Sequence, residues 1–336
     1  MAFVSKIPGI FPKNPIFCSI LANTMLSTVP GVSGAGPSPE KTLLTPVLDS
    51  ELIVRGSITS MPARPDTPTG CPTPASITRA MTELTGINPL FINAGLKHRP
   101  TVPCLDVYGE PGNDPRTTDA VPAAAELYRK GRYAGRLLGG ISDALVLGEC
   151  VPGGTTTALC VLRGLGYHAQ VSSSFVNNPV DIKEKIWDDV SARISAAKPE
   201  NVLDMVRICG DPMMPVAAGI ASSYPGYLVL AGGTQMLAVA AIVKVSGIPV
   251  PAIATTCYVR DDPSANFSRV CDEIGADVTY IDPDFGGIGH SGLARYCIGE
   301  VKEGMGAGGA MYLSFLMGYR PEEIRKKIFD TVRAYS

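Results

Sequence analysis

The sequence predicts an α/β protein with a doubly wound, mainly parallel sheet, helices on both faces in the Rossmann-like manner, and a smaller subdomain appended from the chain ends. Two observations support this fold class. From about residue 144 onward, short apolar and β-branched runs alternate with segments of helix length, which is typical of parallel strands connected by crossover helices. Within the longer segments, apolar residues recur at intervals of three and four, the period of a helix.

The predicted elements follow from these patterns. In the second half of the chain the predicted strands are 144–147, 227–231, 252–257 and 278–281. Strand-like pieces of the first hundred residues are 17–21, 52–54 and 90–93. The predicted helices are 122–138, 155–165, 181–197, 212–222, 234–245, 265–274 and 321–335. The proline-rich stretch 62–70 predicts a long surface loop, which could serve as a lid.

Length and composition narrow the class of partner. With 336 residues, of which 45% are hydrophobic, the chain can form one large core with an appendage. Only 18% of the residues are charged and the formal net charge is −2, which argues against nucleic acid or an anionic membrane as a partner. We therefore expect small-molecule ligands.

The cysteines and the apolar stretches indicate a cytoplasmic protein. Nine scattered cysteines show neither zinc-ligand spacing nor a disulfide framework, so we expect a reducing compartment. Prolines interrupt the apolar N-terminal stretch that a signal peptide would need. The most apolar stretch, residues 227–250, is broken by two glycines and a lysine, which fits a strand, a turn and a helix better than a membrane span.

A glycine-rich turn follows the predicted strand that begins at residue 144. Residues 148–157 read Gly-Glu-Cys-Val-Pro-Gly-Gly-Thr-Thr-Thr and lead into a predicted helix. Paired glycines allow a ligand to approach closely, and the new helix offers N–H groups to a phosphate. A tight turn with a threonine N-cap is the alternative; we favour a ligand site because an acid lies at the sheet edge where open α/β folds bind ligands. The predicted ligand-binding residues are Glu149, Gly153, Gly154, Thr155 and Thr156.

A second turn of the same kind follows the predicted strand 227–231. Residues 231–235 read Ala-Gly-Gly-Thr-Gln, and together the two loops could hold the phosphate and ribose of one nucleotide. Taken alone, this loop fits an ordinary βα turn equally well. Neither loop has the three-glycine dinucleotide fingerprint or a P-loop lysine, so NAD and ATP are not predicted. The residues predicted to bind the nucleotide here are Gly232, Gly233 and Thr234.

An acid lies at the start of a third glycine-rich turn, which precedes an apolar segment of helix length. Residues 299–310 read Gly-Glu-Val-Lys-Glu-Gly-Met-Gly-Ala-Gly-Gly-Ala. Partial burial would raise the pKa of the Glu303 carboxyl toward neutrality and make it a candidate general base. The alternative is that Glu303 only stabilises the positive end of the following helix. The residues alone do not choose between these interpretations.

No cofactor and no metal site are predicted. The three histidines are far apart, and none has an acid or a nucleophile at a diagnostic spacing. Two aspartate pairs, at 188–189 and 261–262, do not follow a strand that leads into a Thr- and Gly-rich loop, so we interpret them as solvated surface instead of magnesium ligands.

Taken together, the three glycine-rich segments resemble the nicotinate-nucleotide:dimethylbenzimidazole phosphoribosyltransferase family, above all its archaeal branch. Bacterial members carry a Gly-Glu-Met-Gly-Ile-Gly-Asn-Thr-Thr run that aligns without gaps on residues 148–156. Their Gly-Glu-Gly-Ser-Gly-Ala run aligns on residues 302–307, and residues 109–118 are similar to the loop that precedes the first glutamate motif. Against the archaeal branch, the likeness extends over residues 17–316.

The resemblance places particular residues in the site. Glu303 falls on the family's catalytic glutamate, and two nearby glycines, Gly304 and Gly306, join the nucleotide-binding set. Bacterial members have Asp-His-Gly where this chain continues differently after residue 22, and a methionine and a serine where it has cysteine and methionine. The resemblance therefore implies a changed pocket for the base. The residues predicted to bind the base are Asn23, Thr24, Cys150 and Met305.

The resemblance also implies a reaction on nicotinate mononucleotide and an aromatic base. Glu303 would remove the N–H proton of an imidazole-type base while the other ring nitrogen attacks C1′ opposite nicotinate, giving an α-ribotide for the lower ligand of a cobamide. We expect residues 16–300 to form the main nucleotide-binding domain and residues 1–15 and 301–336 the appended region. By analogy with the family we expect a homodimer with small-molecule substrates and no cofactor.

Two other functions stay open from the sequence. The chain could bind nucleotides or α-ribotides without turnover, as a sensor or carrier. It could also catalyse another glycosyl transfer, for example as a nucleoside phosphorylase. The acceptor is equally open among dimethylbenzimidazole, other benzimidazoles, phenolics and adenine.

Overall fold

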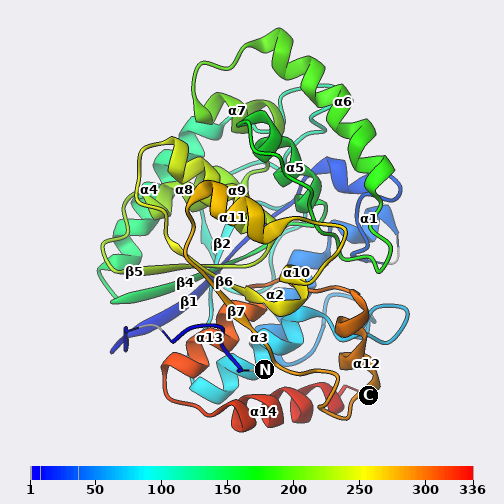
Figure 1. Cartoon of the computed structure of the whole chain (residues 1–336), viewed down its shortest axis with the longest axis vertical. Coiled ribbons are helices and arrows are strands. Elements are labelled where there is room, and N and C mark those ends of the chain that lie inside the picture. Colours follow the sequence, from blue (N-terminus) through cyan, green and yellow to red (C-terminus); the bar gives the residue numbers. More distant parts are fainter. Residues whose placement is uncertain (1, 8, 37, 336) are drawn as a thin grey trace.

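A parallel sheet forms the centre of the protein (Figure 1). The computed structural model describes residues 2–7, 9–36 and 38–335, and in this part of the chain the sheet has seven strands in the order β3-β2-β1-β4-β5-β6-β7. Every neighbouring pair is parallel. Because β1 lies inside the sheet and the chain proceeds outward from it in both directions, the predicted doubly wound α/β fold is confirmed.

The strands agree closely with the predicted ones. Those predicted in the second half of the chain are β4 to β7, and the pieces at 17–21 and 90–93 lie within β1 and β2. Strand β3 was not predicted, because two residues are too few to show a pattern. The strands are β1 (Pro15–Ala22), β2 (Leu90–Gly95), β3 (Leu105–Asp106), β4 (Ala144–Cys150), β5 (Tyr227–Ala231), β6 (Ala252–Thr256) and β7 (Val278–Ile281).

The strand predicted at 52–54 is wrong, because these residues lie in helix α2 (Thr45–Arg55). Proline at the start of the segment suits the first turn of a helix, and Gly56 ends it with a φ of 74°, a left-handed conformation that glycine adopts without cost. A short apolar run with two β-branched residues therefore does not make a strand when both ends of the segment favour a helix.

Helices cover both faces of the sheet (Figure 1). The seven predicted helices correspond to α4, α5, α6, α8, α9, α11 and α14. The first helices are η1 (Met25–Thr28), α1 (Pro39–Thr42), α2 (Thr45–Arg55), α3 (Pro74–Thr85), α4 (Ala124–Gly139), α5 (Gly154–Gly164), α6 (Val180–Ala197) and α7 (Val202–Cys209). The later ones are α8 (Met213–Ala221), α9 (Thr234–Val245), α10 (Cys257–Arg260), α11 (Phe267–Ile274), α12 (Ser291–Ala294), η2 (Arg295–Ile298), α13 (Ala307–Leu316) and α14 (Pro321–Arg333).

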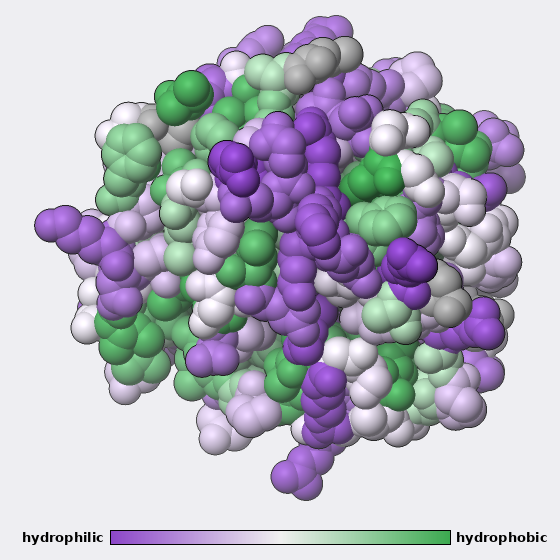
Figure 2. Space-filling model, turned by 90° about the horizontal axis from the view of Figure 1, so that it is seen from below, coloured by the Kyte–Doolittle hydropathy of each residue, from purple (hydrophilic) through white to green (hydrophobic). Residues whose placement is uncertain are grey.

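Alternation along the strands divides the core between the two faces. In β4, Leu145 and Leu147 belong to the larger core, which also contains residues of α4, α5, α8 and α9. Val146 belongs to the second core, with residues of α3, α13 and α14. This two-residue period is the one expected for side chains that point alternately to opposite faces. The outer surface beneath α14, seen in Figure 2, is crossed by a band of hydrophilic side chains.

Helix α13 packs directly on the strands β4 to β7, and α14 packs on α3 and α13. The division into a main domain of residues 16–300 and an appended region stays a prediction. No helix in the described part of the chain is long and apolar enough to cross a membrane.

Candidate functional site

The carboxyl ends of β4, β5 and β6 lie side by side at one edge of the sheet. Strand β4 pairs with β1 on one side and with β5 on the other, so the chain's direction of winding reverses between β1 and β4. In open α/β sheets this reversal leaves a crevice at the carboxyl edge in which ligands bind. The predicted glycine-rich turns follow β4 and β5 at this edge, and helices α5 and α9 begin directly after them.

The turn after β4 requires glycine. Gly153 is the N-cap of α5 with a φ of 77°, and its ideal Cβ would lie 3.0 Å from the Ser27 backbone. Gly154 begins the helix, and a Cβ there would overlap the side-chain amide of Gln235. A side chain at position 153 would therefore be strained and crowded, and one at position 154 would displace Gln235. Both glycines lie on the wall of the cavity described below.

Glu149 is a buried acid at the end of β4. Its Oε2 accepts hydrogen bonds from the Gln235 side-chain amide at 2.6 Å and from the Val151 N–H at 3.1 Å. Burial raises the pKa of Glu149 to about 8, and the nearby negative charges of Asp211 and Glu303 act in the same direction. The group is therefore mostly protonated at neutral pH.

Glu303 lies at the junction of β6 and α13. The N–H groups of Gly304 and Gly308 donate to Oε1, each at 3.1 Å, which places the carboxyl at the positive end of α13. From the end of β6, the Thr256 N–H and the Thr255 hydroxyl donate to Oε2 at 3.2 and 3.3 Å. Burial nevertheless raises the pKa of Glu303 to about 7, although these hydrogen bonds favour its ionised form. This is the range expected for a general base that works at neutral pH.

The backbone around Glu303 is held in unusual conformations. Val301, Lys302 and Met305 all have positive φ values, of 67°, 70° and 49°. Such conformations are costly for residues with a Cβ, most of all for a β-branched valine, and they cluster at functional sites where surrounding contacts enforce them. The hydrogen bonds of the Glu303 and Lys302 side chains hold the backbone of this segment in these conformations.

Lys302 fixes one wall of the site. The residue is 3% exposed, and Nζ donates to the carbonyls of Ser173 and Phe175 at 2.7 and 3.1 Å. Nζ also lies 3.4 Å from Asp262 Oδ2. Burial lowers the pKa of Lys302, while the neighbouring Asp262 raises it. The lysine therefore connects the Glu303 segment to the segment of residues 172–175.

Glu300 fastens the loop of residues 62–70 to the same segment. Its Oε1 accepts hydrogen bonds from the hydroxyls of Thr67, at 2.6 Å, and Thr69. Arg295 Nε donates to Oε2 at 2.5 Å. As predicted, these loop residues contain no helix or strand, and most of them line the cavity described next.

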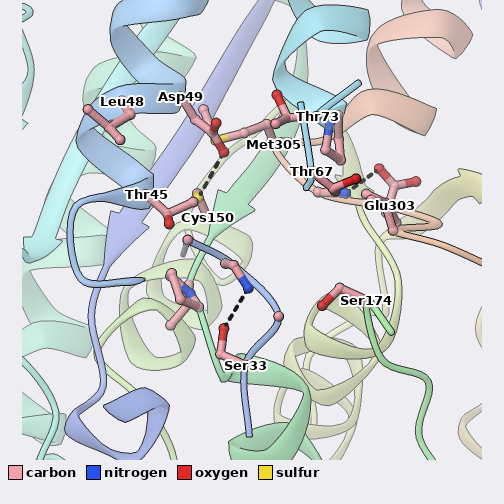
Figure 3. A pocket seen from close by; sticks show the side chains of 18 of the residues that line it. Ser33, Thr45, Leu48, Asp49, Thr67, Thr73, Cys150, Ser174, Glu303 and Met305 are labelled. Atoms are coloured by element: carbon pink, nitrogen blue, oxygen red, sulfur yellow. Dashed lines mark hydrogen bonds between the residues drawn. The ribbon is translucent and has the colours of Figure 1, made fainter. Parts of the chain in front are cut away.

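A cavity of about 640 Å³ opens at this edge of the sheet (Figure 3). The start of α5, the start of α9 and the Glu303 segment form its floor, and α2 with the 62–70 loop forms the opposite walls. The first turns of two helices, α5 and α9, thus lie on one cavity wall, an arrangement that favours an anionic ligand. The predicted site residues on its wall are Glu149, Cys150, Gly153, Gly154, Thr155, Gly233, Thr234, Glu303, Gly304 and Met305.

The sequence is similar over nearly its whole length to proteins of several archaea. No family model matches it. It is 42% identical to a UPF0284 protein of Methanosarcina acetivorans, over 98% of this chain and 97% of that protein. It is 40% identical to a UPF0284 protein of Methanothermobacter thermautotrophicus, over 96% and 93% of the two chains. The chain belongs to the UPF0284 family. A UPF0284 protein of Pyrococcus abyssi is likewise 40% identical to it, over 93% and 95% of the two chains.

Solved structures share the fold of this UPF0284 protein. The crystal structure of nicotinate-nucleotide-dimethylbenzimidazole phosphoribosyltransferase from Thermus thermophilus superimposes with a TM-score of 0.63 at 14% identity, covering 95% of this chain and 83% of that one. A crystal structure of CobT from the same organism also gives a TM-score of 0.63 at 14% identity, covering 94% and 84%. The predicted family resemblance is thus confirmed for the fold.

Two of the residues predicted to bind the base do not lie on the cavity wall of this UPF0284 protein. Asn23 Nδ2 donates to the Leu43 carbonyl, and Asn23 Oδ1 accepts from the Lys97 N–H at 2.8 Å. Thr24 caps the short helix η1 through its hydroxyl oxygen. Both side chains therefore hold neighbouring backbone segments in place, and their contact with a base stays a prediction.

Three predicted nucleotide-binding residues also lie behind the wall. Thr156 is fully buried in the first turn of α5. Gly232 precedes the wall residue Gly233, with its ideal Cβ 3.7 Å from Glu149 Oε1. An ideal Cβ on Gly306 would lie 3.0 Å from the Gly148 Cα, which leaves no room for a side chain. These residues shape the site from behind and do not face its ligand space.

Sequence reasoning missed three functional candidates, Asp49, Gln235 and Lys302. Gln235 directly follows the second glycine-threonine turn, and that position could have identified it. Lys302 stands where the aligned bacterial run begins with glycine, and that difference could have identified it. Asp49 lies in the helix that was predicted in part as a strand, so no local signal pointed to it. In the part of the chain that the structure describes, no three histidine, cysteine or acidic side chains are grouped as metal ligands.

Proposed function

We propose that this UPF0284 protein is a phosphoribosyltransferase that moves ribose 5-phosphate from nicotinate mononucleotide to an aromatic nitrogen base. The observation that carries the proposal is Glu303, a half-buried acid with a pKa of about 7 on the wall of a cavity that the first turns of α5 and α9 also line. The fold shared with nicotinate-nucleotide-dimethylbenzimidazole phosphoribosyltransferase supports the choice of reaction.

The nucleotide would bind through its anionic end at the helix N-termini. The N–H groups in the first turn of a helix have no partners within the helix, and the glycines at 153, 154 and 233 lie on the cavity wall at the starts of α5 and α9. Thr155 and Thr234 add hydroxyl groups on the same wall. We assign the 5′-phosphate and ribose to this floor of the cavity.

Glu303 would serve as the general base. It accepts the N–H proton of an imidazole-type base, while the other ring nitrogen forms a bond to C1′ from the face opposite nicotinate. The C1′–nitrogen bond of the pyridinium breaks, and its electron pair neutralises the ring charge, so nicotinate leaves as a stable molecule. The product is an α-ribotide, the form used for the lower ligand of a cobamide.

A second candidate function is binding without turnover. It is favoured by the donors around Glu303, because groups from residues 255, 256, 304 and 308 already hydrogen-bond its carboxylate and lower its basicity. If the Glu303 carboxylate keeps these hydrogen bonds when a ligand is bound, the protein would bind nucleotides or α-ribotides without turnover, as a sensor or carrier. Release of nicotinate distinguishes the two functions.

The test is to incubate the purified full chain with nicotinate mononucleotide and a panel of benzimidazoles, phenolics and adenine, and to measure free nicotinate and the ribotide by chromatography. Stoichiometric release with one or more bases is the expected result. Binding of the nucleotide without release would replace the proposal with the binding function. Release from nucleosides only in the presence of phosphate or arsenate would indicate a phosphorylase.

We also propose that the protein is a cytoplasmic homodimer that works without a cofactor. Support for the dimer comes from Tyr133, Leu137 and Ile141, apolar side chains that are exposed at helical spacing along and just beyond α4. Light scattering of the purified chain tests it: a mass near 35.3 kDa would contradict the proposal, and twice that mass is expected.

A further inference from the structure

Asp49 is a buried acid with an open hydrogen-bonding oxygen. It lies on α2, is 8% exposed and lines the cavity. Its one hydrogen bond within the described residues comes from the Cys150 thiol, whose Sγ is 3.7 Å from Oδ2. A thiol is a weak donor. Buried carboxyl groups are normally satisfied by stronger partners, so the cavity side of Asp49 is suited to a ligand donor.

Glu51, two residues further along α2, differs from Asp49 because its carboxyl group has several hydrogen-bond donors. It accepts hydrogen bonds from the backbone N–H groups of Thr59 and Ser60, at 2.9 and 3.0 Å, and from the hydroxyls of Ser60 and Thr101. Glu51 does not lie on the cavity wall. Helix α2 thus carries two different acids. Glu51 hydrogen-bonds to the loop that follows the helix, whereas Asp49 lies on the cavity wall.

Asp49 and Glu303 both line the cavity, and Met305 lies between them (Figure 3). The Met305 N–H donates to the Glu149 carbonyl at 3.0 Å, which places it beside Cys150, the partner of Asp49. Cys150 and Met305 belong to one apolar cluster that reaches α2. The stretch of cavity wall between Glu303 and Asp49 therefore carries the apolar side chains of Cys150 and Met305.

The charge of Asp49 decides which substrate this part of the cavity takes. Nicotinate carries its own carboxylate and the ribose carries a phosphate, and Asp49 would repel both. A neutral, flat aromatic base fits the apolar wall, and a donor on its outer ring would meet the carboxyl. Burial raises the pKa of Asp49 to about 7, and such a donor would stabilise the ionised form.

We propose that Asp49 selects acceptor bases that carry a hydroxyl or amino donor on the ring opposite the attacking imidazole. The inference rests on the proposed function and adds the class of acceptor to it. Asp49 takes no part in the bond changes at C1′; it is a specificity-determining residue that accepts one hydrogen bond from the base. Bases with only methyl groups at that edge would leave the buried carboxyl unpaired.

Matched pairs of bases test the inference. Transfer to 5-hydroxybenzimidazole is compared with 5-methoxybenzimidazole, and transfer to 5-aminobenzimidazole with 5-methylbenzimidazole. The wild-type chain is expected to favour the donor of each pair by about tenfold or more in kcat/KM. Comparing the two pairs shows whether the donor is a hydroxyl or an amine. Asp49→Leu should bring the preference close to one, and Asp49→Asn should retain part of it.

Ratios within one variant separate recognition from folding, since a loss of stability lowers both rates together. Glu51→Gln is the matched control: it weakens a buried acid on the same helix and should leave the ratios unchanged. Equal rates for both members of each pair in the wild type, or ratios that survive Asp49→Leu, would overturn the inference. Calorimetric dissociation constants for the same bases give the ratios without turnover, so a chain that binds selectively but releases no nicotinate would refute the proposed function alone.

Discussion

The side-chain amide of Gln235 donates to Glu149 Oε2 at 2.6 Å, so the first turn of α9 holds the acid at the end of β4. Because this acid has a pKa of about 8, its neutral form prevails at pH 7. Glutamine can reproduce the shape and the acceptor of that neutral form. We therefore expect replacement of Glu149 by glutamine and by alanine to have different effects on the free energy of unfolding.

Glu149→Gln should unfold at nearly the same urea concentration as the wild type at pH 7. Glu149→Ala should lose about 1–3 kcal/mol, because the Gln235 amide and the Val151 N–H lose an acceptor inside the protein. Equilibrium unfolding in urea measures both. Equal losses in the two variants would show that Glu149 is needed in its ionised form.

Glu303→Gln should lower kcat by about 10²–10⁴-fold while the KM for nicotinate mononucleotide changes little, because only proton transfer is removed. In the wild type, kcat/KM should rise with pH toward a plateau above about 7, since the base acts in its ionised form. Steady-state kinetics from pH 5 to 9 measure both effects. Full turnover by the variant, or a rate that falls across this range, would remove Glu303 from the mechanism.

Stability should fall as pH rises from about 4.5 to 7. Burial raises the pKa values of Asp49, Glu149, Asp211 and Glu303 to between about 6 and 8. In this window the folded chain therefore binds more protons than the unfolded chain, and ionisation costs folding energy, on the order of 1 kcal/mol or more per group. Lys183, whose pKa burial lowers to about 7, acts in the opposite sense only above that pH.

Urea denaturation at several pH values measures this slope, and Glu303→Gln should reduce it because the variant has one titrating carboxyl fewer. A free energy of unfolding that rises steadily from pH 4.5 to 7 would contradict the burial of these acids.

Gly154→Ala should raise the KM for the nucleotide. The new Cβ would overlap the Gln235 side-chain amide, forcing it away from Glu149 and into the space at the start of α5. Gly286→Ala is a control, because a Cβ there meets only the Cys297 sulfur at an ordinary 3.4 Å. Nucleotide titrations of both variants provide the comparison, and an unchanged KM for Gly154→Ala would argue against ligand binding at this turn.

Lys302→Met should destabilise the protein by about 3–5 kcal/mol and weaken nucleotide binding. The substitution leaves two carbonyls and the Asp262 carboxylate without a buried cation. Lys326→Met removes an exposed pair with Asp330 and should cost less than about 1 kcal/mol. Thermal unfolding of the two variants, with and without nucleotide, tests the difference; similar midpoints would contradict the role of Lys302.

Features encoded within a few residues could be predicted, and features that depend on distant partners could not. The glycine turn at 153–154 and the acid at 303 are local patterns, and the structure brings both to one cavity. Asp49 meets Cys150 across 101 residues of sequence, and Lys302 meets Ser173 across 129. The strand expected at 52–54 is a helix because the proline and glycine at the helix ends outweigh the β-branching of Ile53 and Val54, and only Leu52 and Ile53 are buried.

The hydrogen bonds of Glu300 to Thr67 and Thr69 have a mechanical consequence. One carboxylate closes the outer wall of the cavity, and Glu303 follows it by three positions along a backbone with little freedom. Swinging the wall outward pulls on that same segment. If Glu303 is the general base, a substitution that frees Thr67 and Thr69 from Glu300 should therefore also shift the position of its carboxyl group.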